Sequence, residues 1–569
     1  MLKNFKNIKK LAIDFETNDI DGDFKTDIEL FSLAGRNKKG KLISESFKKS
    51  KLKNLTEILE GKIIIAHNVK FELTVLMNNK LLPKKYEIED TLIMAHLLNS
   101  TMQKDLKSLR VKLLGRKERD KYKDVDKSDM KVFMEYNRLD SEDCFLIYEK
   151  LYPLIPKYEL ETVYELEKKV VYPIIEMERT GVLIDEGLRK EQEKFLLGEL
   201  EKIQKKVDYI SGMDINLNSS KQLQVLLYQI LKVKPQEGWK SKTGYSTAVG
   251  VLETINEKFL HSKSKLGKTT HETVDMILTS RKYNKLISAF VGENVKSRIR
   301  NSRIFSNFNS LGTVTGRFSS SKPNLQQIPK SPFDKDRPIK THIRSLFIAP
   351  KGWKILTADY SQIELVLMAE LSQDKLLKQA FLDGVDLHRQ TADLVGATDR
   401  SLGKTLNFAV GYGISPMGFS RNTGISERDA AQYIDMFFKK YTGVADLIEK
   451  THSYALSKGM IKTITGRRRL FIVKNKSDYG TVKRASFNTL VQGSAADLMK
   501  LALILMYKKL NKRYSRMVMT VHDEVSVYLK DEYVEEGYHI IKYSMENALK
   551  LSIPTRASIG ISDRWSKNK

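Results

Sequence analysis

The sequence predicts a multidomain α/β protein. Its 569 residues are too many for a single hydrophobic core, so several domains are expected. Residues 1–150 alternate strand-like runs, such as LAID and KIIIAH, with helix-like segments, which is an α/β pattern. Residues 158–210 are typical of long charged helices punctuated by Pro173 and Gly181, and residues 260–300 form another basic helical stretch. From residue 301 onward, strand and helix signals alternate with loops.

The composition suits a soluble globular protein, and its charge favours a polyanionic partner. Hydrophobic residues make up 41% and charged residues 30%, and no apolar stretch is expected to reach membrane-spanning length. The start lacks the apolar core of a signal peptide, and the single cysteine, Cys144, fits a reducing compartment. The net charge of +28 favours nucleic acid as the partner. A lysine-rich composition that merely solubilises the chain is the alternative.

Two stretches in the C-terminal half place acids at the ends of expected strands. In TADYSQIEL (357–365), Asp359 follows a short apolar run and Glu364 enters an apolar helical pattern. In RMVMTVHDEVSVYL (516–529), two strand-like runs flank Asp523 and Glu524, which predicts a hairpin with both acids near its turn. Acids at a helix N-terminus and ordinary turn chemistry are the alternatives. Carboxylates converging in one sheet would suit paired magnesium ions that assist phosphoryl transfer.

A third stretch, DRSLGKTLNFAVGYG (399–413), repeats its side chains at helical spacing. Arg400, Lys404, Phe408 and Tyr412 recur every four residues and form one winding stripe. Cations followed by aromatic rings suit a triphosphate and a base. An amphipathic helix with a solvated basic end is the alternative.

The N-terminal region carries a second acidic constellation. Asp14 and Glu16 share one face of an expected strand, and together they suggest a cation. Glu72 follows the run IIIAH, and Tyr136 and Asp140 are neighbours one helical turn apart. Two further acids are interpreted differently: Asp90 as a helix cap and Asp143 as a surface residue.

DYSQIEL, R-x3-K-x3-F-x3-YG and VHDE, in that order, resemble the three polymerase motifs of family A DNA polymerases. TGRFSSSKPNLQQIP (315–329), DLHRQTA (386–392) and KRASFNTLVQGSAAD (483–497) agree with that family, and INLNSSKQL with KTGYST resembles its thumb. The match spans most of residues 165–569. The resemblance implies a right-hand polymerase fold with palm, fingers and thumb.

The polymerase resemblance implies a role for each matching residue. Metal ligands would be Asp359, Tyr360 and Asp523, with Glu524 assisting nearby. The incoming nucleotide would be bound by Arg400, Lys404, Phe408, Tyr412, His388, Gln362 and Glu364, of which Glu364 would exclude a ribose 2′-hydroxyl. Primer or template would be contacted by Arg317, Arg484, Asn488, Gln492 and His522. In this family a phenylalanine at the position of Phe408 goes with poor use of dideoxynucleotides.

DFET, HNxxFE and YxxxD resemble the ribonuclease-H-like 3′–5′ exonuclease domain of the same family. That resemblance implies Asp14, Glu16, Glu72 and Asp140 as metal ligands and Tyr136 as the residue that positions the attacking water. The family usually has aspartate where this chain has Glu72. The added methylene can displace the carboxylate, and a shift of about 1 Å can cost on the order of a hundredfold in rate.

The expected organisation is an exonuclease domain over 1–155 and a polymerase domain over 156–569. Within the latter we expect a thumb at about 160–300, a palm at about 301–375 and 484–569, and fingers at about 376–483. No room is expected before Asp14 for a 5′-nuclease domain. This expectation favours a phage or a mobile element as the source.

The expected reaction is template-directed addition of deoxynucleotides to a primer 3′-hydroxyl, with 3′–5′ proofreading. It would need two Mg²⁺ ions per active site, with Mn²⁺ as a substitute, and primer-template DNA and deoxynucleoside triphosphates as partners. We expect a monomer without a membrane, in the cytoplasm of a bacterial or phage-infected cell; an organelle is the alternative, although no clear transit peptide is present.

Four alternatives stay open. The exonuclease domain could be inactive, or the chain could be a nucleic-acid-binding subunit without catalysis. A nuclease with a degraded polymerase half is disfavoured by Asp359, Lys404 and Asp523. A single-subunit RNA polymerase is disfavoured by Glu364 and the proofreading half.

Overall fold

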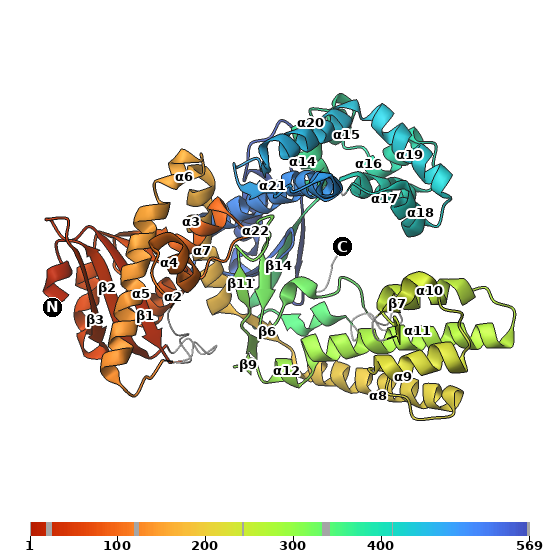
Figure 1. Cartoon of the computed structure of the whole chain (residues 1–569), viewed down its shortest axis with the longest axis horizontal. Coiled ribbons are helices and arrows are strands. Elements are labelled where there is room, and N and C mark those ends of the chain that lie inside the picture. The colour runs from red at the N-terminus through yellow and green to blue at the C-terminus, as the bar shows by residue number, and fades with distance from the viewer. Residues whose placement is uncertain are drawn as a thin grey trace.

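The computed structural model describes residues 2–18, 26–118, 125–241, 244–332, 342–411 and 413–565. Figure 1 shows an α/β domain at the N-terminal end, joined through helix α7 (Glu161–Thr180) to a larger part. In that larger part, two groups of helices extend from a central sheet. The predicted boundary between residues 155 and 156 falls inside the short helix α6 (Leu154–Lys157).

The N-terminal domain is built on a five-stranded sheet with the order β3-β2-β1-β4-β5. β1 pairs in parallel with β4 and antiparallel with β2. Leu11, Ile13 and Phe15 of β1 enter one core, whereas Ala12 enters the core on the other face. Asp14 and Glu16 share the face of Ala12, because side chains alternate along a strand. The strands are β1 (Lys10–Thr17), β2 (Ile28–Arg36), β3 (Leu42–Lys48), β4 (Lys62–Ala66) and β5 (Tyr86–Asp90).

Helices cover this sheet, and the longest, α5 (Met130–Leu151), packs across β1, β2 and β3. Because α5 crosses the sheet, residues near position 140 can meet the acids of β1. The remaining helices of the domain are α1 (Leu55–Leu59), α2 (Val69–Asn78), α3 (Thr91–Leu98) and α4 (Leu106–Leu114).

Helix α7 has two buried faces. Leu166 and Val170 enter the core of the larger part, whereas Val171 and Ile175 enter the core of the N-terminal domain. The expectation that Pro173 punctuates this region was wrong, since Pro173 lies inside the continuous helix. Packing on both faces offsets the cost of an interior proline, about 3 kcal/mol. The helix ends at Gly181, as expected, with a φ of 58° that favours glycine.

The central sheet has the order β17-β18-β14-β19, and every pair in it is antiparallel. Its strands are β14 (Trp353–Tyr360), β17 (Ser515–Val521), β18 (Glu524–Lys530) and β19 (Ala557–Ser562). Helix α22 (Val534–Glu546) packs on β14, β18 and β19, and helix α21 (Tyr479–Lys509) contacts α22. The predicted hairpin over 516–529 is confirmed as β17 and β18.

The expectation about apolar stretches needs a correction at α21. By length and composition the segment Lys476–Lys509 could cross a membrane, although 83% of its apolar window is buried inside the protein. The helix is apolar because it is a core helix, contacting α7, α14, α20 and α22.

One group of helices follows α7 and has a core of its own, which includes Val207, Leu227 and Ile277. Its helices are α8 (Glu186–Ser211), α9 (Ser220–Gln224), α10 (Val249–Phe259) and α11 (Lys265–Leu286), with α12 (Glu293–Lys296) after them. The other group lies between β14 and α21 in the sequence. It comprises α14 (Ile363–Ser372), α15 (Lys375–Asp383), α16 (Leu387–Leu394), α17 (Arg400–Gly411), α18 (Pro416–Thr423), α19 (Glu427–Lys440) and α20 (Thr442–Lys458).

Short strands connect these parts. A small sheet has the order β13-β6-β10-β9, and three hairpins pair β7 with β8, β11 with β12 and β15 with β16. The strands are β6 (Val182–Ile184), β7 (Lys240–Ser241), β8 (Gly244–Tyr245), β9 (Ile299–Arg300), β10 (Arg303–Ile304), β11 (Asn307–Asn309), β12 (Ser319–Ser321), β13 (Phe347–Ile348), β15 (Met460–Lys462) and β16 (Arg468–Leu470).

Candidate functional site

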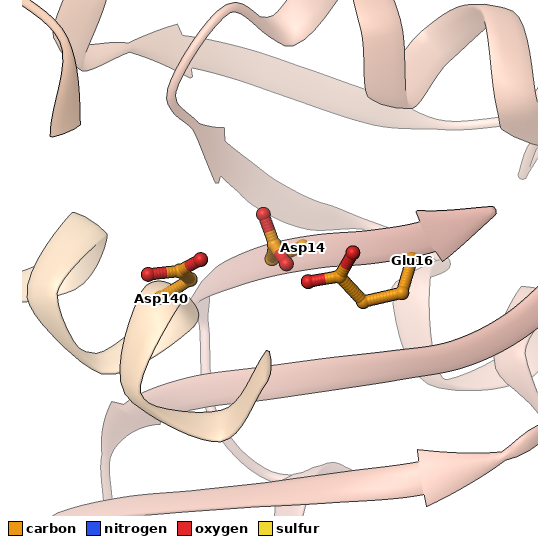
Figure 2. A group of neighbouring side chains, drawn as sticks. All are labelled: Asp14, Glu16 and Asp140. Atoms are coloured by element: carbon orange, nitrogen blue, oxygen red, sulfur yellow. The ribbon is translucent and has the colours of Figure 1, made fainter. Parts of the chain in front are cut away.

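Three carboxylates meet in the N-terminal domain. Figure 2 shows Asp14 and Glu16 on a strand facing Asp140 on a helix, and one oxygen of each lies within 4.8 Å of the others. Burial and repulsion from Asp140 raise the pKa of Asp14 well above its usual value, and they raise that of Glu16 to about 8. Oxygen ligands that repel one another are stabilised by a divalent cation. The donor set therefore fits a metal ion.

Asn137, which the sequence analysis did not single out, holds one of these acids. Its side-chain amide donates to Asp14 Oδ2 at 2.8 Å, and its own Oδ1 accepts from Ser46 Oγ at 2.7 Å. Its backbone carbonyl accepts from Ser32 Oγ at 2.7 Å. The amide is buried and fixed at both ends, so it sets the orientation of the Asp14 carboxylate. Its place in the sequence YNRLD, between the two motif residues, was the available signal.

Glu72 and Tyr136 lie at the edge of this cluster. Glu72 projects from α2 and is buried, but it does not belong to the group of three close carboxylates. Its charge still contributes to the raised pKa of Asp14, and burial raises its own pKa well above the usual value. Tyr136 is half-buried one turn before Asp140, with the Lys107 ammonium 5.4 Å from its ring centre.

Two further acids of this domain have structural roles. Asp90 caps α3, as predicted, by accepting from the backbone N–H groups of Leu92 and Ile93, and it also accepts from Val69 N. The prediction that Asp143 lies on the surface was wrong, because it has no exposed surface. Its carboxylate is paired with Arg116 at 2.5 Å and with Arg110 at 3.4 Å.

Two acidic residues, Asp359 and Asp523, lie at the same end of the central sheet. Asp359 is the penultimate residue of β14, and Asp523 lies in the turn between β17 and β18. The backbone N–H of Tyr360 donates to the carbonyl of Asp523 at 3.2 Å, which holds the turn beside the strand end. Burial raises the pKa of Asp523 to about 6; Arg317 opposes this rise, and Glu364 and Asp359 add to it. Two acids held at one end of a sheet, one on a strand and one in the neighbouring turn, fit a hard divalent ion.

The neighbours of these two acids are engaged elsewhere. The hydroxyl of Tyr360 donates to the carbonyl of Met545 at 2.7 Å, so a metal contact from Tyr360 would use its backbone carbonyl. Glu524 pairs in register with Asp359, but its buried carboxylate accepts from Arg344 at 3.0 Å and from the Trp565 indole. Arg344 and Trp565 were not anticipated, because they lie 180 and 41 residues from Glu524.

The predicted nucleotide face is carried by α16 and α17. Arg400 and Lys404 are exposed, and Arg400 Nε donates to Asp386 Oδ2 at 2.6 Å. The His388 ring lies 5.8 Å from the Phe408 ring and contacts Asn407 Nδ2 at 3.1 Å. Burial, followed by the charge of Arg400, lowers the pKa of His388, so its ring is neutral near pH 7. Tyr412 lies outside the described residues.

The remaining predicted residues join α14, α21 and the central sheet. Gln362 precedes α14 and contacts His388 Nε2 at 3.4 Å. Glu364 forms an ion pair with Arg317, and a small pocket brings Glu364 together with Phe408, Asn488 and Gln492.

Arg484 and His522 remain exposed. Arg484 lies beside Gly413. The backbone N–H of His522 donates to Gln326 Oε1 at 2.7 Å, and His522 has a φ of 56°, in the left-handed region that non-glycine residues rarely adopt.

Comparison with known proteins agrees with this geometry. The chain matches the family "DNA polymerase family A" over residues 186–567 and the family "3'-5' exonuclease" over residues 1–155. It is 34% identical to DNA polymerase I of Caldicellulosiruptor bescii, over 74% of this chain and 49% of that protein. It is 30% identical to DNA polymerase I of Borreliella burgdorferi, over 100% of this chain and 63% of that protein. The chain thus spans about half to two thirds of the length of these relatives.

A solved structure gives the same arrangement of the chain. It is described as the POL domain of Pol1 from M. smegmatis in complex with DNA primer-template and dNTP. The TM-score is 0.84 at 24% identity, covering 99% of this chain and 97% of that one, which shows a shared fold. The predicted fold class, an exonuclease domain followed by a polymerase domain, is confirmed. The chain belongs to DNA polymerase family A.

Proposed function

We propose that the chain extends a DNA primer by template-directed addition of deoxynucleotides and removes nucleotides from the primer 3′ end at a separate site. The convergence of Asp359 and Asp523 at one end of the central sheet carries the first activity. The close triad of Asp14, Glu16 and Asp140 supports the second.

For synthesis, each part of the site has a distinct task. Asp359 and Asp523 would hold the metal ions, which when bound stabilise the charge on the attacking and leaving oxygens. Arg400 and Lys404 bind the triphosphate as cations. Neutral His388, held by Asn407, donates or accepts a hydrogen bond next to Phe408, on which the base packs. The pocket of Glu364 and Phe408 lies beside the sugar, where Glu364 excludes a 2′-hydroxyl.

The remaining predicted residues support the site or contact the DNA. Glu524 supports the hairpin through Arg344 and Trp565, since both partners occupy its carboxylate. Arg317 holds Glu364, and the exposed Arg484 and His522 are available to primer or template together with Asn488 and Gln492. We propose fingers, palm and thumb with the boundaries given from the sequence.

For primer shortening, Asp14, Glu16 and Asp140 would hold the metal ions that stabilise the phosphoryl displacement when bound. Asn137 orients Asp14, and Tyr136, one turn of α5 before Asp140, positions the attacking water. Glu72 adds negative charge from α2 at the edge of the cluster.

The proposal extends to cofactor, partners and place. The metal is Mg²⁺, two ions per active site, and Mn²⁺ can replace it. The partners are primer-template DNA and deoxynucleoside triphosphates, and the chain acts as a monomer in the cytoplasm. Its charge of +28 suits contact with phosphates, so DNA affinity should fall steeply as salt rises.

A primer-extension gel with Mg²⁺ tests both activities. The wild-type chain should lengthen a labelled primer when deoxynucleotides are present and shorten it when they are absent. Ribonucleotides should be poor substrates, and Glu364→Ala should accept them more readily. Tight DNA binding without either reaction would overturn the proposal and favour a binding subunit. Extension without shortening would reject only the exonuclease activity, and the glutamate at position 72 would be the first cause to examine.

A further inference from the structure

A pocket of about 580 Å³ lies where α7 meets the central sheet and the N-terminal domain. Tyr172 and Arg179 of α7 line it, together with Trp353 at the start of β14. Asp359 lies six residues further along the same strand, which at 3.3 Å per residue is roughly 20 Å away. The pocket is therefore separate from the proposed polymerase site.

Three guanidinium groups line this pocket without a carboxylate partner in the described part of the chain. Arg303 Nη1 donates to the carbonyls of Thr180 at 3.1 Å and Gly181 at 3.2 Å. Arg516 Nη1 donates to the carbonyl of Ser515 at 2.7 Å. Arg179 is exposed and makes no hydrogen bond or ion pair with any described residue. Backbone carbonyls thus hold two of these cations in place without neutralising them.

The acid that lines the pocket is already satisfied. Glu176 forms an ion pair with Lys512, and its other oxygen accepts from the backbone N–H of Met517 at 3.0 Å. The negative charge of Glu176 is therefore neutralised by Lys512. The three arginines leave an uncompensated positive charge in a concave site, which attracts an anion.

Aromatic rings form part of the remaining wall, beside Met77, Ile175, Thr180, Pro350 and Lys512. The Lys512 ammonium lies 3.8 Å from the centre of the Tyr507 ring and covers one face of that ring. The rings of Tyr172 and Tyr507 lie 6.2 Å apart, and both side chains are half-buried, as is Trp353. Flat rings of this kind bind a nucleobase by stacking with little regard to its identity. The pocket volume also lies within the range of roughly 300–1,000 Å³ that is usual for small-molecule sites.

We propose that this pocket is a nucleotide-binding site distinct from both carboxylate sites. The base lies against Trp353, and a phosphate is bound by Arg179 and Arg516. A free nucleotide and one nucleotide within a single strand present the same chemistry. The inference does not depend on the proposed catalytic activities, because it concerns binding at a different place.

Equilibrium dialysis with ADP in EDTA tests the site, since EDTA withholds divalent metal from both carboxylate clusters. The wild-type chain should bind one ADP. Arg179→Glu should bind at least tenfold more weakly, and Arg516→Ala should also lose affinity. Arg298→Glu is the matched control, because Arg298 is an exposed arginine bonded to a backbone carbonyl, that of Asn294 at 3.1 Å, outside the pocket.

Two further probes identify what is recognised. Ribose 5-phosphate should bind more weakly than ADP, because it lacks the base. A tetranucleotide that binds more tightly than ADP would identify a single strand as the source, and the reverse order would identify a free nucleotide. Failure of ADP to bind, equal losses in Arg179→Glu and Arg298→Glu, or ribose 5-phosphate binding as tightly as ADP would overturn the proposal.

Discussion

The two carboxylate sites of this chain differ in the number of acids and in the charges that surround them. In the N-terminal domain, three acids crowd within 4.8 Å, and the nearest described support for Asp14 is the uncharged amide of Asn137. At the central sheet, Asp359 and Asp523 are two acids, and the positive charge of Arg317 partly offsets the rise in the Asp523 pKa. Lys127 and Lys107 also oppose the rise at Glu16, yet the pKa of Glu16 reaches about 8, whereas that of Asp523 reaches about 6. The first site is therefore the more strongly anionic cluster, and the second is closer to balance without a metal.

Metal-assisted phosphoryl transfer, proposed for both sites, can therefore use two different electrostatic environments. A crowded anionic cluster gains most from a cation, because the cation relieves repulsion among buried charges. A more balanced site gains less from a cation. Four predictions use this contrast, in order of decreasing expected effect, and a direct test of the two sites follows them.

Substitutions of metal ligands should remove metal ions from one site without affecting the other. At pH 8, Glu16→Ala should weaken Mn²⁺ binding at the N-terminal cluster by more than about a hundredfold, because losing a ligand costs more than losing a residue that orients one. Counting bound Mn²⁺ by electron paramagnetic resonance checks this. Asp359→Ala is the matched control and should leave the N-terminal ions in place. Loss of the same ions in both variants would contradict two independent sites.

Stability should depend on pH differently at the two sites. The folded state raises the pKa of Glu16 from 4.5 to about 8, so it binds this proton more tightly than the unfolded state. The resulting stabilisation is complete below pH 4.5 and is lost as the pH rises to about 8, a change on the order of a few kcal/mol. Asp523 loses its smaller contribution by about pH 6.

Urea unfolding in EDTA between pH 5 and 8.5 measures this effect. Glu16→Gln should flatten the loss of stability above pH 6, whereas Asp523→Asn should leave that part of the curve unchanged. Mg²⁺ should restore stability at pH 8. A wild-type free energy of unfolding that stays constant between pH 6 and 8 in EDTA would argue against the crowded cluster.

The two supporting asparagines offer a mirrored test. Asn137→Ala should slow primer shortening by about 10–100-fold, because Asp14 loses the donor that orients it, and should spare extension. Asn407→Ala should slow extension, because His388 loses its partner, and should spare shortening. Single-turnover rates of both reactions measure the split. If both variants slow both reactions alike, the asparagines act on the whole fold.

The smallest expected change in overall extension comes from Phe408→Tyr. The variant should incorporate dideoxynucleotides more readily, while extension with the four deoxynucleotides stays close to that of the wild type. Competition between dideoxy- and deoxynucleotides on a sequencing gel measures the ratio. Efficient dideoxy termination by the wild-type chain would contradict the role given to Phe408.

Short-range spacing predicted the elements that carry the sites. The alternation of Asp14 and Glu16, the turn of helix from Tyr136 to Asp140 and the hairpin around Asp523 all follow from local geometry. Contacts between distant segments did not follow. Asp143 is buried because Arg116 pairs with it, and Glu524 is occupied by Arg344. Pro173 stays helical because packing on two cores outweighs a local preference.

The most direct test of two separate active sites is one gel that compares wild type, Asp523→Ala and Asp14→Ala on the same primer-template. Each protein is incubated with Mg²⁺, with and without deoxynucleotides. We predict that Asp523→Ala loses extension by on the order of a thousandfold and keeps shortening, whereas Asp14→Ala shows the reverse. Loss of both reactions in either variant, with the fold intact by circular dichroism, would contradict the account.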